Sequence, residues 1–176
     1  RDTGYMTMIA PGSTIGILGG GQLGRMLAAA ANQLGFDVHI YCPETDAPAS
    51  RGARRTWTAE YTDRDALREF AASCDAVTLE FENIPVEAVE IITQTGVPLH
   101  PGTKSLAVSQ DRAEEKAFLN SINIPTAPYE LINSADDIIA ALNTLGTEGI
   151  LKTRRDGYDG KGQARVQDAK GAEKAW

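Results

Sequence analysis

The stretch Ile-Leu-Gly-Gly-Gly-Gln-Leu-Gly-Arg-Met, residues 17–26, decides which fold the chain adopts. Its glycines form the pattern G-x-G-x-x-G at Gly19, Gly21 and Gly24. A short apolar strand, residues 14–18, precedes the pattern, and residues 22–34 place apolar side chains on one face of a helix. This context is typical of a dinucleotide site, because the backbone approaches the ligand closely and the helix N-terminus attracts anions. The stretch alone leaves open whether the ligand is a dinucleotide.

Composition limits the functions open to the chain. It has 176 residues, a net charge of −7 and 42% hydrophobic residues, which suffices for one domain and part of another. The acidity disfavours nucleic-acid binding, which needs clustered lysines and arginines. No apolar run is long enough to span a membrane, and the N-terminal residues lack a signal-peptide pattern. We therefore expect a cytoplasmic protein without nucleic-acid or membrane partners.

The cysteines and histidines form no metal-binding pattern. Cys42 and Cys74 lie far apart, with neither C-x-x-C nor zinc spacing, so we expect free thiols in a reducing compartment. His39 falls within a second strand at residues 38–42, where we interpret it as a packing residue. His39 and His100 make no metal pair, and we predict no metal ligand in this chain.

Strand and helix signals alternate over residues 14–102 and predict one α/β domain with a parallel sheet and helices on both faces. Further strands are expected at 55–58, 76–81 and 96–100, with helices at 63–73 and 85–95. Residues 1–13 are expected to be a lead-in. Arg1 is not a natural first residue, and Met6 or Met8 is the expected initiator after residues left over from cloning.

The pattern changes at residue 103. The sequence predicts helices at 103–108 and 112–121, an extended segment at 126–132, a helix capped by Ser134, and paired strands at 149–153 and 162–166. Another helix is expected to begin at Ala169. Because two strands and an unfinished helix cannot bury a core of their own, we expect residues 103–176 to begin an incomplete second domain.

The turn between the last two strands indicates phosphate binding. Lys152 ends the first of these strands and supplies a point charge suited to phosphate. Three glycines, Lys161 and two arginines follow within a few residues. Glycines let such a turn lie close over a ligand and direct backbone N–H groups toward it. The alternative interpretation is a solvated hairpin tip.

Four motifs, in this order, support a more specific interpretation. They are Gly-Gly-Gly-Gln-Leu-Gly-Arg-Met (19–26), Glu-Phe-Glu-Asn-Ile-Pro (80–85), Gln-Asp-Arg-Ala-Glu-Glu-Lys (110–116) and Leu-Lys-Thr-Arg-Arg-Asp-Gly-Tyr-Asp-Gly-Lys-Gly-Gln (151–163). With them the chain, from Thr14 to its end, resembles the N5-carboxyaminoimidazole ribonucleotide synthetases of the ATP-grasp superfamily. The resemblance implies a Rossmann-like substrate-binding pre-ATP-grasp domain at 14–102. The start of a truncated ATP-grasp nucleotide-binding domain would follow at 103–176.

The resemblance also implies a reaction. ATP, bicarbonate and 5-aminoimidazole ribonucleotide would give the N5-carbamate, ADP and phosphate, with Mg²⁺ at the nucleotide, in a homodimer. ATP would convert bicarbonate, a poor electrophile, to carboxyphosphate, and the exocyclic amine would capture the carboxyl group. The family's magnesium ligands lie later than Trp176, so we expect this chain alone to be inactive, and no catalytic residue is assigned.

Site residues follow from the matched motifs. The residues implied for ATP are Arg112, Lys152, Gly157, Tyr158, Asp159, Gly160, Lys161, Gly162 and Gln163. Those implied for the ribonucleotide are Gly21, Gln22, Leu23, Gly24, Glu82 and Asn83. Strand alternation is expected to put Glu80 and Glu82 on one side of their strand, although one could instead cap the next helix and the other pair with an arginine. Glu44, placed where a dinucleotide fold carries its ribose-binding acid, becomes an ordinary strand-end acid.

Three alternatives remain open. Another ATP-grasp ligase is one, either a formate-dependent glycinamide ribonucleotide transformylase, which typically has Glu in place of Gln22, or a biotin carboxylase. An NAD(P)-dependent oxidoreductase is another, but it leaves the turn after Lys152 unexplained. The third is a non-catalytic nucleotide-sensing module.

Overall fold

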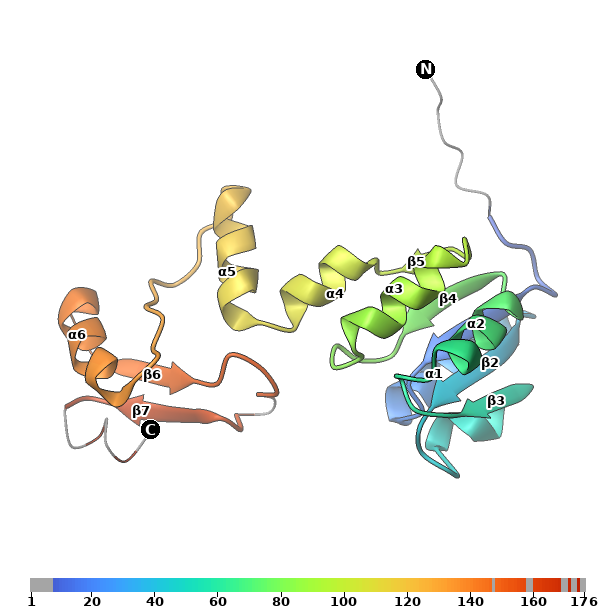
Figure 1. Ribbon diagram of the computed structural model, residues 1–176, viewed down its shortest axis with the longest axis horizontal. Helices are drawn as coiled ribbons and strands as arrows, with labels where there is room; N and C mark the ends of the chain where they lie inside the picture. Colours follow the sequence, from blue (N-terminus) through green and yellow to red (C-terminus); the bar gives the residue numbers. More distant parts are fainter. Residues whose placement is uncertain (1–7, 147, 158–159, 169–170, 172–173, 175–176) are drawn as a thin grey trace, which may run out of the picture. The chain divides into compact units, whose positions relative to one another are not determined.

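The computed structural model describes residues 8–146, 148–157, 160–168, 171 and 174 (Figure 1). The chain divides after Leu106 into two compact units, which we call unit 1 (to Leu106) and unit 2 (from Ala107). Each unit is described by itself.

Unit 1 is built on a five-stranded parallel sheet in the order β3-β2-β1-β4-β5. The strands are β1 (Thr14–Leu18), β2 (Asp37–Cys42), β3 (Arg55–Thr58), β4 (Ala76–Leu79) and β5 (Leu99–His100). The helices are α1 (Gln22–Gln33), the 3-10 helix η1 (Pro48–Gly52), α2 (Arg64–Ala72) and α3 (Val86–Gln94). This arrangement confirms the predicted α/β domain with a parallel sheet.

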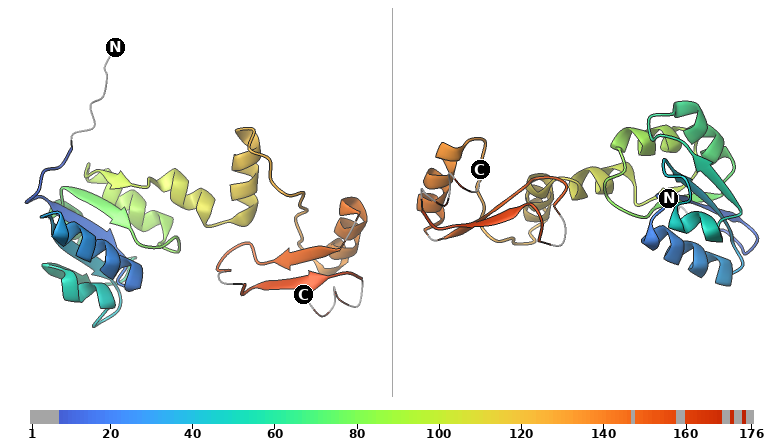
Figure 2. Two further views of the ribbon diagram at one scale, coloured as in Figure 1. Left: turned by 180° about the vertical axis from the view of Figure 1, so that it is seen from behind. Right: turned by 90° about the horizontal axis from the view of Figure 1, so that it is seen from below.

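The two faces of the sheet carry separate cores. Ile17 pairs with Ile40, and both belong to a cluster with buried alanines of α1 and η1. The next residues, Leu18 and Tyr41, point the other way into a cluster with α2 and α3. Alternation along the strands therefore buries both faces, and helices lie on both sides of the sheet in the right-hand view of Figure 2.

Two predicted strands are shorter than expected. β4 ends at Leu79 rather than Phe81, and β5 covers only Leu99–His100. The Glu80 N–H still bonds to the Leu18 carbonyl at 3.0 Å, after which the chain turns away toward α3. The prediction that the strand extends over Glu80 and reaches Phe81 was therefore wrong, and alternation along β4 does not set the directions of Glu80 and Glu82.

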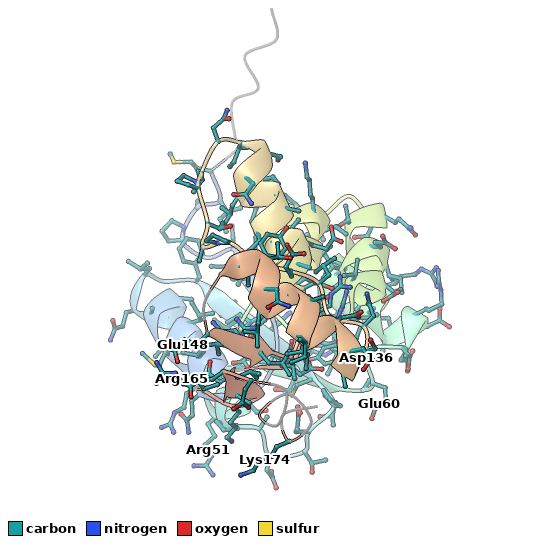
Figure 3. The ribbon with its side chains drawn as sticks, turned by 90° about the vertical axis from the view of Figure 1, so that its left-hand side faces the viewer. Arg51, Glu60, Asp136, Glu148, Arg165 and Lys174 are labelled. Atoms are coloured by element: carbon teal, nitrogen blue, oxygen red, sulfur yellow. The ribbon has the colours of Figure 1, made fainter. Side chains whose placement is uncertain are left out.

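Unit 2 contains short helices and one antiparallel strand pair. Its elements are α4 (Thr103–Ser109, which spans the division), α5 (Arg112–Ser121), α6 (Ala135–Leu145), β6 (Gly149–Lys152) and β7 (Gln163–Val166). Ile138 of α6 and Val166 of β7 are the buried residues of a small core. At the edge of the pair, Glu148 and Arg165 form an ion pair at 2.9 Å (Figure 3). The start of the helix expected at Ala169 lies outside the described residues.

Candidate active site

The strand order places two loops of unit 1 together. The order reverses between β1 and β4, and ligands of open parallel sheets bind at the carboxyl ends of the strands on either side of such a reversal. The glycine turn follows β1, and Glu80 follows β4. Both segments therefore meet where the fold is expected to bind its ligand.

The carboxylate of Glu80 occupies the N-terminus of α1. Its Oε1 accepts a hydrogen bond from the Gly21 N–H at 2.7 Å, and its Oε2 accepts one from the Gly24 N–H. Gly21 is the N-cap of α1 and has no side chain, so Glu80 supplies from the loop after β4 what a capping side chain would supply locally. A negative charge there is also stabilised by the helix dipole.

The turn is closely packed around this carboxylate. A Cβ atom at Gly19, whose φ is +112°, would lie 2.2 Å from Glu80 Cγ. One at Gly24 would lie 2.7 Å from Glu80 Oε2. The glycines are thus needed for contact with a protein carboxylate, and two of the N–H groups that could bind an external anion are already hydrogen-bonded.

A pocket of about 220 Å³ opens beside the turn. It is lined by Gly20, Gly21, Glu44, Ala47, Pro48, Tyr61, Glu80 and Phe81. Burial, followed by the nearby charge of Glu44, raises the pKa of the Tyr61 hydroxyl, which therefore stays protonated at neutral pH. The pocket thus offers two carboxylates and a phenol O–H, a set suited to hydroxyl or amine groups of a ligand.

The predicted substrate residues are distributed unevenly around this pocket. Gly21 and Gly24 hold Glu80, whereas Gln22 and Leu23 are exposed in the first turn of α1. Glu82 and Asn83 are exposed in the loop after β4 and lie outside the pocket's lining.

The sequence did not indicate the positions of two pocket residues. Glu44, treated there as an ordinary strand-end acid, lines the pocket, and Glu80 caps α1 rather than the next helix. The signal for Glu80 was its place directly after a strong strand, which identifies its role only once β4 is known to lie beside β1.

Among the described residues of unit 1, neither Cys42 nor Ser73 is activated as a nucleophile. Burial raises the pKa of the Cys42 thiol to about 11, so it stays protonated at neutral pH. Ser73 donates its hydroxyl hydrogen to the Phe70 carbonyl at 2.6 Å. His39 Nδ1, 2.9 Å from Ser73 Oγ, must therefore be the donor of that pair and cannot accept the serine proton.

The glycine-rich turn of unit 2 connects β6 to β7. Lys152 is exposed at the end of β6, opposite Gln163. The Thr153 N–H bonds to the Gly162 carbonyl at 2.8 Å, and Gly162 has a φ of +67° that favours glycine. The turn thus brings together most of the predicted nucleotide residues, including Gly157, Gly160 and Lys161; Tyr158 and Asp159 lie outside the described residues.

The arginines around this turn bind protein groups. Arg112 donates from Nε to the Thr153 carbonyl at 3.1 Å and from Nη2 to the Gly157 carbonyl at 2.7 Å. Arg154 and Arg155 form ion pairs with Asp111 at 2.7 and 3.5 Å. The positive charges of Arg154 and Arg155 are therefore partly neutralised by Asp111.

The described ranges contain no group of three or more His, Cys, Asp or Glu side chains that could hold a metal ion. In the same ranges, no helix is both long and apolar enough to cross a membrane.

These features define a class of protein. A parallel α/β unit, followed along the chain by a glycine-rich strand pair carrying a lysine, matches the two-domain arrangement that the motif resemblance implies. The family model described as the ribonucleotide synthetase preATP-grasp domain matches residues 12–110, and the ATP-grasp domain model matches residues 117–176. The chain belongs to the ribonucleotide synthetase pre-ATP-grasp family.

Particular relatives make the family more specific. An N5-carboxyaminoimidazole ribonucleotide synthase of Brucella melitensis is 51% identical over 160 residues, which are 91% of this chain and 44% of the relative. The Staphylococcus aureus N5-carboxyaminoimidazole synthetase solved with ADP has a TM-score of 0.88 and 36% identity, over 94% of this chain and 44% of that one. The Aspergillus clavatus enzyme, solved with ADP and 5-aminoimidazole ribonucleotide, has a TM-score of 0.77 and 26% identity. The match covers 94% of this chain and 43% of that one. The resemblance to this synthetase family is confirmed, and the chain spans about half the length of these relatives.

Proposed function

We propose that the full-length protein catalyses the ATP-dependent carboxylation of 5-aminoimidazole ribonucleotide by bicarbonate, in purine biosynthesis. The Brucella relative supports this activity by its identity, and the Aspergillus structure supports the ligand pair by what it binds. The observation in this chain that carries the proposal is the carboxylate of Glu80, fixed by two backbone amides at the edge of a pocket.

We assign to Glu80 the recognition of uncharged polar groups on the ribonucleotide. Each of its oxygens uses one lone pair on an amide of the turn, and the others remain for hydroxyl or amine hydrogens. A carboxylate repels a phosphate, so the ribonucleotide's phosphate lies away from Glu80. Gly21, Gln22, Leu23 and Gly24 are proposed to contact the substrate around this carboxylate, and the exposed Glu82 and Asn83 approach it from the next loop.

We assign the nucleotide to the β6–β7 turn. Lys152 is exposed and supplies the charge for a phosphate, while the segment from Gly157 to Gln163, Tyr158 and Asp159 included, covers the phosphates. Arg112 is proposed to contribute at this site while it holds the turn through two carbonyl groups.

The chemistry proposed for these residues is positioning and charge neutralisation. Bicarbonate attacks the terminal phosphorus of ATP and releases ADP. The exocyclic amine of the ribonucleotide then bonds to the carboxyl carbon, loses a proton and displaces phosphate. When bound, Mg²⁺ supplies charge neutralisation at the nucleotide phosphates. In this proposal the glycine-rich turn excludes water from the labile activated carboxyl group.

The Glu80 contact also weighs against a dinucleotide-dependent oxidoreductase. In that class the pyrophosphate is bound by the N–H groups of the glycine turn and the helix N-terminus. Here the carboxylate of Glu80 takes two of those groups and places a negative charge where the pyrophosphate would lie.

Replacement of Glu80 in the full-length enzyme tests the proposal. Glu80→Gln keeps the size of the side chain and one amide acceptor but removes the charge, so we expect KM for the ribonucleotide to rise by about tenfold or more, with little change in KM for ATP. Glu82→Gln, in the same loop, shows which carboxylate matters more.

Thermal unfolding of both variants separates substrate binding from helix capping. A fall in Tm of Glu80→Gln with unchanged KM for the ribonucleotide would reduce Glu80 to a cap and remove the main support for the proposal.

Two further properties are part of the proposal. We propose a homodimer, supported by the exposed apolar side chains Met26 and Leu27 on α1, which are 67% and 41% exposed. Light scattering of the full-length protein measures this. A cytoplasmic location is supported by the free thiols of Cys42 and Cys74.

A further inference from the structure

Asp111 is a buried acid that joins two parts of unit 2, the start of α5 and the segment that follows β6. Its side chain is 5% exposed, and it is the N-cap of α5. Oδ1 accepts hydrogen bonds from the Ala113 N–H at 2.9 Å and from Arg154 Nε at 3.0 Å. Oδ2 lies 2.7 Å from Arg154 Nη2, so the guanidinium grips both carboxylate oxygens in the two-pronged geometry of the strongest arginine pairs.

The electrostatics favour the ionised acid. Burial alone would raise the pKa of Asp111, but the hydrogen bonds from Arg154 and from the α5 amides outweigh it, and the pKa is lowered. Arg155 adds a weaker attraction at 3.5 Å. The acid is thus charged at neutral pH and fully engaged with the segment that follows β6.

The neighbouring residue completes the connection. The Arg112 N–H bonds to the Arg154 carbonyl at 3.0 Å, and its guanidinium bonds to the carbonyls of Thr153 and Gly157. A Cβ atom at Gly157 would lie 3.0 Å from Arg112 Nη2, so the turn and the guanidinium are in close contact. Asp111 and Arg112 therefore bind side-chain and main-chain groups of residues 153–157 from one helix end.

We propose that Asp111 is a positioning residue for nucleotide binding, which fixes the first half of the β6–β7 turn to the start of α5 through Arg154. The proposal rests on the proposed function, because it assigns the turn to the nucleotide. Capping of α5 by itself needs only the hydrogen bonds from the helix amides. The bidentate pair between the buried Asp111 carboxylate and Arg154 is not needed for capping. In this account, loss of the charge releases Arg154, and residues 153–157 sample other conformations.

Asp111→Asn in the full-length protein tests this, because asparagine is also a good N-cap but lacks the charge that holds Arg154. We expect ADP binding, measured by calorimetry, to weaken by about tenfold, which is the size of one charge-assisted hydrogen bond. Binding of 5-aminoimidazole ribonucleotide should be unchanged. Amide hydrogen exchange of residues 153–157 should become faster.

The matched control is Asp63→Asn. Asp63 is the N-cap of α2, where its side chain accepts from the Ala66 N–H at 3.0 Å, and it lies in unit 1. The same substitution there should leave ADP affinity unchanged. Arg154→Met breaks the pair from its other side and should weaken ADP binding like Asp111→Asn, which keeps the test usable if one variant fails to fold.

Three results would overturn the inference. One is wild-type ADP affinity in both Asp111→Asn and Arg154→Met. A second is an equal loss of ADP and ribonucleotide binding, which would indicate general destabilisation. The third is a wild-type protein that binds no ADP, which would also refute the proposed function, whereas the first two leave it intact.

Discussion

Glu80 shows how single residues determine what the glycine turn can bind. The pattern G-x-G-x-x-G is compatible with an anion at the helix N-terminus, but here a carboxylate from the residue that follows β4 lies in that position. The side chain fits because Gly19, Gly21 and Gly24 leave room for it. In another fold these glycines would admit a pyrophosphate. Here they admit the carboxylate of Glu80, which presents hydrogen-bond acceptors at the turn.

Substitution of Gly24 should therefore disturb Glu80 first. In Gly24→Ala the new methyl group would lie 2.7 Å from Glu80 Oε2 and 3.0 Å from the Gly19 carbonyl. We expect a loss of about 1–3 kcal/mol in the free energy of unfolding, as is usual for overpacking, together with a higher KM for the ribonucleotide. Denaturant unfolding and steady-state kinetics measure the two effects.

Gly102→Ala is the matched control, since a Cβ atom there meets nothing within 4 Å. Equal unfolding midpoints for the Gly24 and Gly102 variants would show that Glu80 is not held as tightly as the structure indicates.

At the scale of elements, local signals predicted most of the secondary structure. β1, β3 and α5 have the predicted bounds, and Asp63 and Ser134 cap the helices expected of them. Each of these features depends on residues within a turn or two of one another. Fold class was accessible for the same reason, because alternating strands and helices imply a parallel sheet.

The contacts that shape the candidate sites were not accessible in that way. Glu80 lies 59 residues from Gly21, and Arg154 lies 43 residues from Asp111. A single sequence does not specify such pairings. Motif resemblance indicated these segments and named Glu82 as a substrate residue, which stays a prediction. The contact of Glu80 with the glycine turn and the pairing of Arg154 with Asp111 came only from the structure.

The start of α6 carries a testable pH dependence. Asp137 accepts hydrogen bonds from the Asn133 and Ser134 N–H groups at 2.8 and 2.9 Å, and these bonds lower its pKa below the ordinary 3.8. A depressed folded-state pKa contributes stability that is complete above the unfolded value and is lost as pH falls through the folded value. We therefore expect Asp137→Asn to flatten the loss of stability as the pH falls below about 4.

Chemical denaturation across this range measures the effect, with Asp136→Asn as control. Asp136 precedes Asp137 in the same turn, and its replacement removes one charge without touching the capping box (Figure 3). If both variants show the same acid dependence, net charge rather than the capping box is responsible.

At the scale of the whole molecule, the two units present different chemistry. Unit 1 places Glu44 and Glu80 at a pocket suited to the polar groups of a ribonucleotide. Unit 2 places Lys152 beside a glycine-rich turn suited to phosphates. The proposed reaction therefore needs two different ligands. The full-length enzyme should release ADP only when the ribonucleotide is present as well as ATP.

The most direct test is ADP release by the full-length protein, with 5-aminoimidazole ribonucleotide and bicarbonate each added or withheld. We predict that ADP release requires both and that the N5-carbamate accumulates with it. ADP release driven by glycinamide ribonucleotide with formate, or by biotin, would contradict the assigned substrate. The absence of ATP use under every condition would contradict the assignment of the β6–β7 turn to the nucleotide, and with it the central claim.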